Sequence, residues 1–151
     1  MDGKHNSMIK DAENLALPKV VAAIIVRGET VLAARRRPGG PFGGLWEFPG
    51  GKLEKDEEPE NGLARELAEE LGIESSVGEL VCSVPFRGHG LMIELLAYTV
   101  DLQLGEFRLS DHAEVTWLAI ADLDEMVFAE PDRPVVRLLK TRFAGRGERP
   151  A

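Results

Sequence analysis

The stretch Gly50–Ile73, GGKLEKDEEPENGLARELAEELGI, joins a dense run of acidic residues to a regular apolar pattern. Pro59 suits the first turn of a helix, and Gly72 suits the position that follows a last helical turn. The sequence therefore predicts a helix from Pro59 to Leu71. Its apolar residues share one face, which must be buried: Leu63, Ala64, Leu67, Ala68 and Leu71.

The second half of this helix carries Glu66, Glu69 and Glu70 on one side, about 100° wide, beside the apolar face. A solvated charged surface is the ordinary explanation for acidic helix residues. Here the like-charged pairs and the helix dipole together cost about 1–2 kcal/mol. Pairing of Arg65 with Glu69 offsets only part of that cost. Three clustered carboxylates therefore suggest a bound hard cation, Mg²⁺ or Mn²⁺.

Strands and helices are expected around this segment in an order typical of an α+β domain. The predicted strands are 19–26, 30–35, 45–48, 77–86, 91–102 and 114–118. A short helical turn at 121–126 and a helix at 133–143 follow. We expect a flexible N-terminal arm at 1–17, one folded domain at 18–144 and a polar C-terminal tail at 145–151.

The composition limits the classes of function. A net charge of −8 argues against binding along a nucleic acid polymer, because such proteins usually carry a basic face. It is compatible with a phosphate-bearing substrate if metal ions screen the acids. No segment approaches the roughly 20 apolar residues of a membrane span, and no secretory h-region is present. The single cysteine, Cys82, is expected to be a buried small hydrophobe, and these features together favour the cytoplasm.

The spacing of the acidic stretch resembles the signature of a known family. Gly51 is followed after five residues by Glu57, and after seven more by Arg65-Glu66-Leu67-Ala68-Glu69-Glu70-Leu71-Gly72-Ile73. This matches the Nudix box, G-x5-E-x7-R-E-U-x-E-E-x-G-U with U apolar, at every fixed position. The segment 45–52, LWEFPGGK, further resembles the MutT branch, which includes 8-oxo-dGTP diphosphatases and CTP pyrophosphohydrolases. The resemblance covers residues 19–143.

The resemblance implies a Nudix fold, an α/β/α sandwich in which a mixed β-sheet lies between helices and the box forms a loop, a helix and a loop. It also implies Mg²⁺ as cofactor, with Mn²⁺ as an alternative. Glu69 and Glu70 would be direct ligands, joined by the carbonyl of Gly51 and by Glu66 as a ligand or base, and Glu57 would bind the metal through water or stand behind the direct ligands. Either Glu66 or Glu69 would be the catalytic base that activates water, and the sequence does not separate them. Arg65 is expected to hold the box together by ion pairing.

Relatives in this family often use a further acidic ligand from outside the box. The loop 111–114 is its expected source here, with Asp111 or Glu114 as the ligand. His112 in the same loop is better explained as a surface residue.

Contacts to the phosphates or sugar are expected from basic residues. Arg36 ends the second strand near the glycine loop, where MutT-like enzymes place an arginine against the nucleotide; a solvated strand end explains it equally well. This chain departs from the family at Leu91, where relatives often carry an arginine. Arg87 or His89 would then substitute.

The base pocket is expected to involve Phe48 and Asp132. Core packing is an equally good explanation for Phe48, as is helix capping for Asp132. An ionised Asp only accepts hydrogen bonds, which favours the exocyclic amino group of cytosine or adenine. A protonated Asp132 would keep 8-oxoguanine open as a substrate.

The predicted function is Mg²⁺-dependent hydrolysis of the diphosphate linkage of nucleoside triphosphates, oxidised ones included, to a monophosphate and pyrophosphate. The alternatives are a Nudix hydrolase of another diphosphate, such as ADP-ribose, and a nucleotide-sensing Nudix domain without catalysis. Sensing domains usually lose acids of the box, and all of them are present here. The partner is a small nucleotide, and a homodimer is left open.

Overall fold

The computed structural model describes residues 17–104 and 112–147. Within these ranges the first sheet has the strand order β5-β1-β7-β6. Its strands are β1 (Lys19–Ile24), β5 (Gly50–Lys52), β6 (Glu74–Gly88) and β7 (Leu91–Leu104). The sheet is mixed, because β1 runs parallel to β7 and antiparallel to β5. The second sheet is antiparallel and contains β2 (Val26–Arg27), β3 (Thr30–Arg36), β4 (Trp46–Glu47) and β8 (His112–Ala119).

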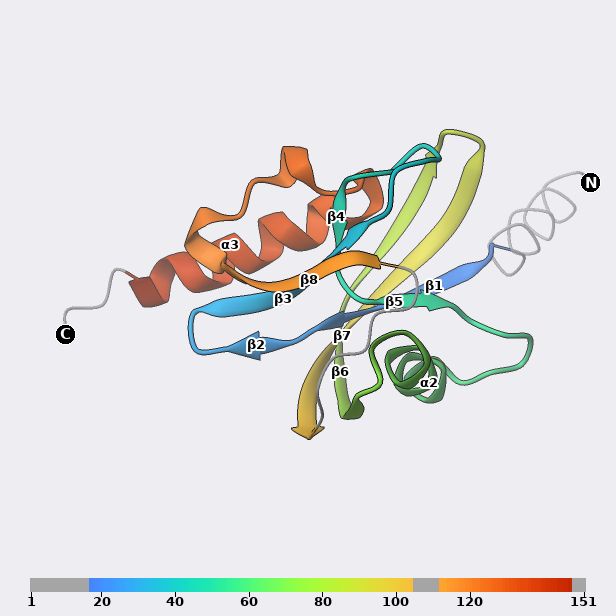
Figure 1. Cartoon of the computed structure of the whole chain (residues 1–151), viewed down its shortest axis with the longest axis horizontal. Helices are drawn as coiled ribbons and strands as arrows, with labels where there is room; N and C mark the ends of the chain where they lie inside the picture. The colour runs from blue at the N-terminus through green and yellow to red at the C-terminus, as the bar shows by residue number, and fades with distance from the viewer. Residues whose placement is uncertain (1–16, 105–111, 148–151) are drawn as a thin grey trace, which may run out of the picture.

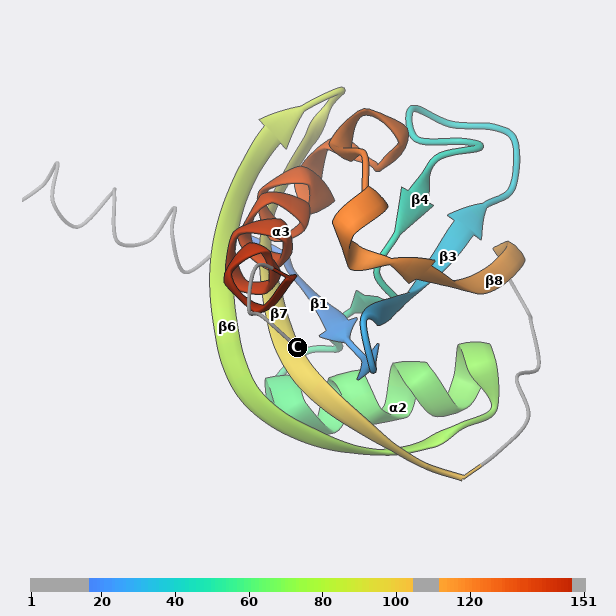
Figure 2. The same ribbon diagram turned by 90° about the vertical axis from the view of Figure 1, so that its left-hand side faces the viewer.

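Two α-helices cover the sheets in the described part of the chain. Helix α2 (Pro59–Leu71) and helix α3 (Arg133–Gly147) lie on opposite sides of β1 (Figures 1 and 2). Three short 3-10 helices lead from β8 into α3 and are η1 (Ile120–Asp122), η2 (Glu125–Val127) and η3 (Glu130–Asp132). This arrangement confirms the predicted α+β class and its α/β/α sandwich.

Successive residues of β1 face two separate cores, as the period of a strand buried on both faces requires. Ala22 and Ile24 belong to the cluster beneath α3, whereas Val21 and Ala23 belong to the cluster beneath α2. Because both faces are covered, β1 has no polar face, which explains its continuous apolar sequence. The central strands are thereby packed between the two helices.

Helix α2 begins and ends where the sequence predicts. Leu63, Leu67 and Leu71 are fully buried, so the leucines of the predicted apolar face are buried as expected. Ala64 is half-buried and Ala68 is exposed, so the buried face is narrower than predicted. Gly72 adopts φ 65°, and its N–H donates to the carbonyl of Ala68 over 3.0 Å. A left-handed residue at this position ends the helix with little strain only if it lacks a Cβ.

The strand boundaries differ from the expected ones. The strands predicted at 77–86 and 91–102 extend to Glu74–Gly88 and Leu91–Leu104, because mostly polar residues at their ends pair through their backbones, with one side-chain hydrogen bond from Gln103 to Ser76. Such pairing leaves no apolar alternation in the sequence. The strand predicted at 45–48 shortens to Trp46–Glu47, and the Phe48 N–H donates to the side chain of Asp132 instead of to a neighbouring strand.

Three further expectations need correction. The helical turn predicted at 121–126 is divided into η1 and η2. Helix α3, predicted to end at residue 143, continues to Gly147, inside the range 145–151 expected as a tail. Cys82 is half-buried rather than buried, because it lies on the edge strand β6. None of the helices in the described ranges is long and apolar enough to cross a membrane.

Candidate active site

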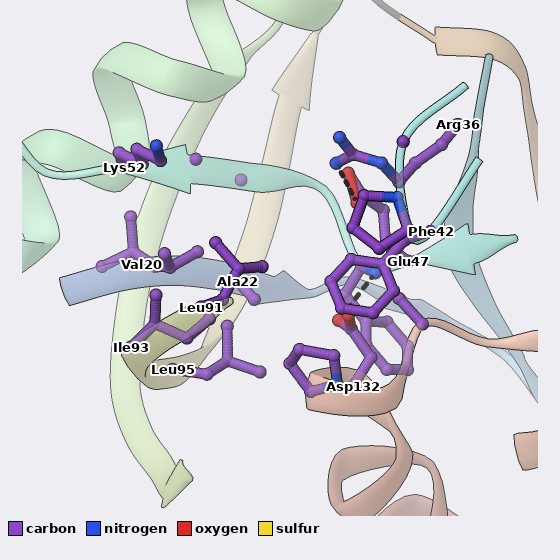
Figure 3. Close-up of a pocket in the computed structure, with 18 of the residues that line it drawn as sticks. Val20, Ala22, Arg36, Phe42, Glu47, Lys52, Leu91, Ile93, Leu95 and Asp132 are labelled. Carbon is purple, nitrogen blue, oxygen red and sulfur yellow. Dashed lines mark hydrogen bonds and ion pairs between the residues drawn. The ribbon is translucent and has the colours of Figure 1, made fainter. Parts of the chain in front are cut away.

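A cavity of about 690 Å³ lies where β1, β5 and β7 meet the loop that follows β3 (Figure 3). Its charged lining residues are Arg36, Arg37, Glu47, Lys52, Glu66, Glu70 and Asp132. Its remaining wall includes a row of aliphatic side chains from β1 and β7, namely Val20, Ala22, Leu91, Ile93 and Leu95. The cavity thus has polar groups around an apolar wall, which is typical of small-molecule sites.

The first polar group of the cavity comes from β5 and α2. Gly51 lies so close to Glu66 that a Cβ at position 51 would overlap the Glu66 carboxylate. Glu70 follows Glu66 by one helical turn and also lines the cavity. Carboxylates and a backbone carbonyl are the donors that hard divalent cations prefer, so these residues fit a metal site. Because glycine has no side chain, the carboxylate of Glu66 can lie next to the backbone of Gly51.

Arg65 lies at the centre of an ion-pair network beside that group. Its Nε and Nη2 donate to the two oxygens of Glu57 over 2.7 and 2.8 Å. Its Nη1 donates to Glu66 and to Glu69 over 3.1 Å each. The hydrogen bonds from Arg65 lower the pKa of Glu57 to about 2. This network offsets the repulsion expected between Glu66 and Glu69 on α2, because one guanidinium donates to both carboxylates.

The structure does not bring all predicted metal ligands together. Glu57 and Glu69 are turned to Arg65 and do not line the cavity, and Glu69 is exposed. Among residues 17–104 and 112–147, no three His, Cys, Asp or Glu side chains converge closely enough to hold a metal ion. Outside the box, Asp111 falls beyond the described residues. Glu114 on β8 pairs with Arg35 over 3.2 Å, away from the cavity lining.

Asp132 and Phe48 meet at another part of the cavity. Asp132 is only 6% exposed, and its Oδ1 accepts a hydrogen bond from the Phe48 N–H over 3.2 Å. Burial, and then the nearby charge of Glu47, raises the pKa of Asp132 well above its ordinary value. The ring of Phe48 is 3% exposed and lies 5.2 Å from that of Phe128, so Phe48 both packs in the core and lines the cavity.

Glu47 is a site residue that the sequence reasoning missed. Its Oε1 accepts a hydrogen bond from Arg36 over 2.9 Å, and both side chains line the cavity (Figure 3). The contact with Glu47 raises the pKa of Arg36. Strands β3 and β4 are antiparallel with Ala34 opposite Glu47, which brings the two charges together across the strands. A prediction that these two strands pair would have indicated that Glu47 lies near Arg36.

Arg87 is exposed on β6 and does not line the cavity, whereas Leu91 does. His89, at the tip of the β6–β7 hairpin, is also absent from the lining and pairs with Glu130 over 2.7 Å. The cavity therefore receives an aliphatic side chain at the position where relatives were expected to carry an arginine. Its positive charge comes from Arg36, Arg37 and Lys52 instead.

Replacing Asp132 by Asn is expected to change how stability depends on pH. The folded chain raises the pKa of Asp132, so this residue stabilises the fold fully below its ordinary pKa of about 3.8. That contribution is lost as the pH rises through the raised value. The variant lacks this titration, so its free energy of unfolding relative to the parent should increase with pH. Urea unfolding across acidic to mildly alkaline pH measures it.

The exposed Asp122 provides the control for that experiment, since Asp122→Asn removes a carboxylate of the same type from the surface. A difference between the Asp132 variant and the parent that stays constant with pH would contradict the prediction.

Comparisons with known proteins show the family of this chain. The NUDIX domain family matches residues 16–139, and the chain therefore belongs to the Nudix family and is a hydrolase of it. Its relatives are MutT-like. The chain is 41% identical over 133 residues to the CTP pyrophosphohydrolase of Escherichia coli, covering 88% of this chain and 96% of that one. It is 33% identical over 121 residues to the 8-oxo-dGTP diphosphatase of Haemophilus influenzae, covering 79% and 89%.

Solved structures support the same fold. The solution structure of the Escherichia coli ORF135 protein matches with a TM-score of 0.71 and 40% identity over 89% of this chain and 94% of that one. The crystal structure of a MutT Nudix hydrolase from Burkholderia pseudomallei matches with a TM-score of 0.72 and 29% identity, covering 80% and 95%. Nudix hydrolases generally use divalent metals, which agrees with the oxygen donors found beside Gly51.

Proposed function

We propose that this protein is a Mg²⁺-dependent pyrophosphohydrolase of nucleoside triphosphates, and that its substrates include modified or oxidised nucleotides. The observation that carries the proposal is one cavity with two distinct polar groups. Gly51, Glu66 and Glu70 supply oxygen donors at one of them, and Asp132 with Phe48 supplies a carboxyl and an aromatic ring at the other. The cavity of about 690 Å³ is within the size range of small-molecule sites.

The reaction follows from what these groups can do. A bound divalent cation would neutralise charge on the phosphoryl oxygens and lower the pKa of water; Glu66, Glu70 and the backbone of Gly51 would hold it, joined by Glu57 and Glu69 if they leave Arg65. Glu66 or Glu69 takes a proton from the attacking water. The water oxygen bonds to phosphorus as the bond to the bridging oxygen breaks, which releases the monophosphate and pyrophosphate.

The residues of the chain also orient the substrate. Arg36 and Lys52 place positive charge beside the expected path of the phosphates. Asp132 would meet the edge of the base, with Phe48 beside it. Because burial favours the neutral form of Asp132, its carboxyl can both donate and accept a hydrogen bond. This keeps 8-oxoguanine a substrate candidate alongside cytosine and oxidised adenine.

Pyrophosphate release from a panel of nucleoside and deoxynucleoside triphosphates, with and without Mg²⁺, tests the proposal. We expect Mg²⁺-dependent release with a clear preference for one base or lesion. No release by well-folded protein would favour a nucleotide-sensing domain, and release of AMP from ADP-ribose instead would favour the other hydrolase type.

Substituting Asp132 by Ala tests the assignment of the base contact. We expect kcat/KM for the preferred nucleotide to fall by about tenfold or more, and kcat/KM for poorer substrates to fall less. The ratio of kcat/KM between the preferred nucleotide and the others should therefore decrease. Steady-state kinetics over the same panel measures this. An unchanged order and ratio of substrates would show that Asp132 does not read the base.

The remaining expectations stay predictions. These are a cytoplasmic location, the lack of a nucleic acid polymer as partner, a homodimer, the arm at 1–17, Arg87 as a substrate contact, and Asp111 or Glu114 as a metal ligand.

A further inference from the structure

The wall around Asp132 is assembled from segments that are far apart in the sequence. Phe42 comes from the loop after β3, Leu91 from the start of β7, and Asp132 from the end of η3. Figure 3 shows Phe42 and Asp132 on the same side of the cavity, away from Lys52. Their relative positions depend on contacts between segments rather than on one helix or strand.

His89 contacts two of these segments from just outside the cavity. Its Nε2 lies 2.7 Å from Oε1 of Glu130, the first residue of η3. Its ring meets that of Phe42 edge-on, with centroids 5.5 Å apart and planes at 78°. Phe86 on the same hairpin also meets Phe42, at 6.1 Å. The hairpin tip thereby joins the loop and η3.

The backbone at this point does not itself need an imidazole. His89 and Gly90 form the two-residue turn between the paired residues Gly88 and Leu91, with φ of 53° and 76°. Asn followed by Gly is the preferred sequence for such a turn. The contacts of the side chain, not the turn, are therefore what distinguishes histidine at position 89.

We propose that His89 is a positioning residue for nucleotide binding, which holds Phe42 and the Glu130 end of η3 in the places where they shape the pocket around Asp132. Glu130 and Asp132 are two residues apart in one short helix, so a displacement of Glu130 moves the carboxyl that faces the base. The inference rests on the proposed function, because it assumes that the nucleotide base lies against Asp132.

The variant His89→Asn tests this with little effect on the fold, because Asn suits the turn but is too short to keep both contacts. We expect KM for the preferred triphosphate to rise about three- to tenfold, which corresponds to about 0.7–1.4 kcal/mol, while kcat stays within about twofold. A residue that only supported the fold would lower the thermal midpoint and the active fraction, and would leave KM unchanged.

Two glutamates provide a matched pair. Glu130 and Glu125 each begin a 3-10 helix and each form one exposed pair, with His89 over 2.7 Å and with Arg137 over 2.9 Å. We expect Glu130→Ala to raise KM as His89→Asn does, and Glu125→Ala to leave KM unchanged. A KM unaffected by both His89→Asn and Glu130→Ala, or raised equally by Glu125→Ala, would overturn the proposal.

Binding of an α,β-methylene deoxynucleoside triphosphate, measured by calorimetry, separates this proposal from the proposed function. If the parent binds this analogue but hydrolyses no triphosphate, the proposed function fails, and a Kd raised by His89→Asn still supports positioning. If the parent binds no α,β-methylene deoxynucleoside triphosphate, whatever its base, both proposals are overturned.

Discussion

Replacing Glu70 by Gln is expected to lower kcat by about 10²- to 10³-fold while the fold survives. Glu70 lines the cavity one helical turn from Glu66, and the change removes negative charge from the expected cation site while preserving the size of the side chain. We expect Glu66→Gln and Glu69→Gln to lose most turnover as well, the latter because its carboxylate is an expected ligand and a candidate base.

Mg²⁺-dependent pyrophosphate release, measured together with thermal unfolding, tests this prediction. Glu60→Gln is the matched control, because Glu60 is exposed in the first turn of the same helix and does not line the cavity. Near-normal turnover in both the Glu69 and the Glu70 variant would refute the carboxylate site.

Replacing Gly51 by Ala is expected to lower kcat by about 10²-fold and to change stability little. The added Cβ would overlap the carboxylate of Glu66. Because the obstacle is the end of a flexible side chain, the carboxylate can move aside and β5 can stay paired with β1. The expected loss of activity therefore comes from a misplaced donor rather than from unfolding.

Two other glycines make that experiment specific. A Cβ at Gly50 would overlap the backbone carbonyl of Val21, which cannot move freely, so Gly50→Ala should destabilise the fold strongly. A Cβ at Gly78 would crowd the hydroxyl of Thr99, outside the cavity, so Gly78→Ala should leave kcat unchanged. Normal turnover in Gly51→Ala would show that the position of the Glu66 carboxylate does not limit catalysis.

The oxygen-donor group of the site was largely predictable because it depends on local spacing. Glu66 and Glu70 lie one turn apart, beside the buried Leu67, and a regular helix necessarily places them on one side. Proline at the first position and glycine after the last defined both ends of α2, as the structure confirms. Chemistry that lies within one helix can be inferred without knowing the packing of the chain.

The group around Asp132 was only partly predictable because it depends on contacts between distant segments. Arg36 meets Glu47 through the pairing of β3 with β4, and Asp132 meets the backbone of Phe48 across 84 residues. The periodicity of apolar residues in a sequence does not indicate such contacts. Arg36, Phe48 and Asp132 could therefore be assigned from the sequence only by resemblance, and Glu47 was not assigned.

The sequence by itself determined the helix of the acidic stretch, the family and the kind of chemistry, because all three are encoded in side-chain types at fixed local intervals. Only the tertiary structure decided which acids face the cavity. Glu66 and Glu70 line it, whereas Glu57 and Glu69 pair with Arg65 outside the lining. Glu66 also pairs with Arg65 and lines the cavity nonetheless. The physical reason is that helical spacing sets which residues share a side, but the packing of α2 against β5 sets what that side meets.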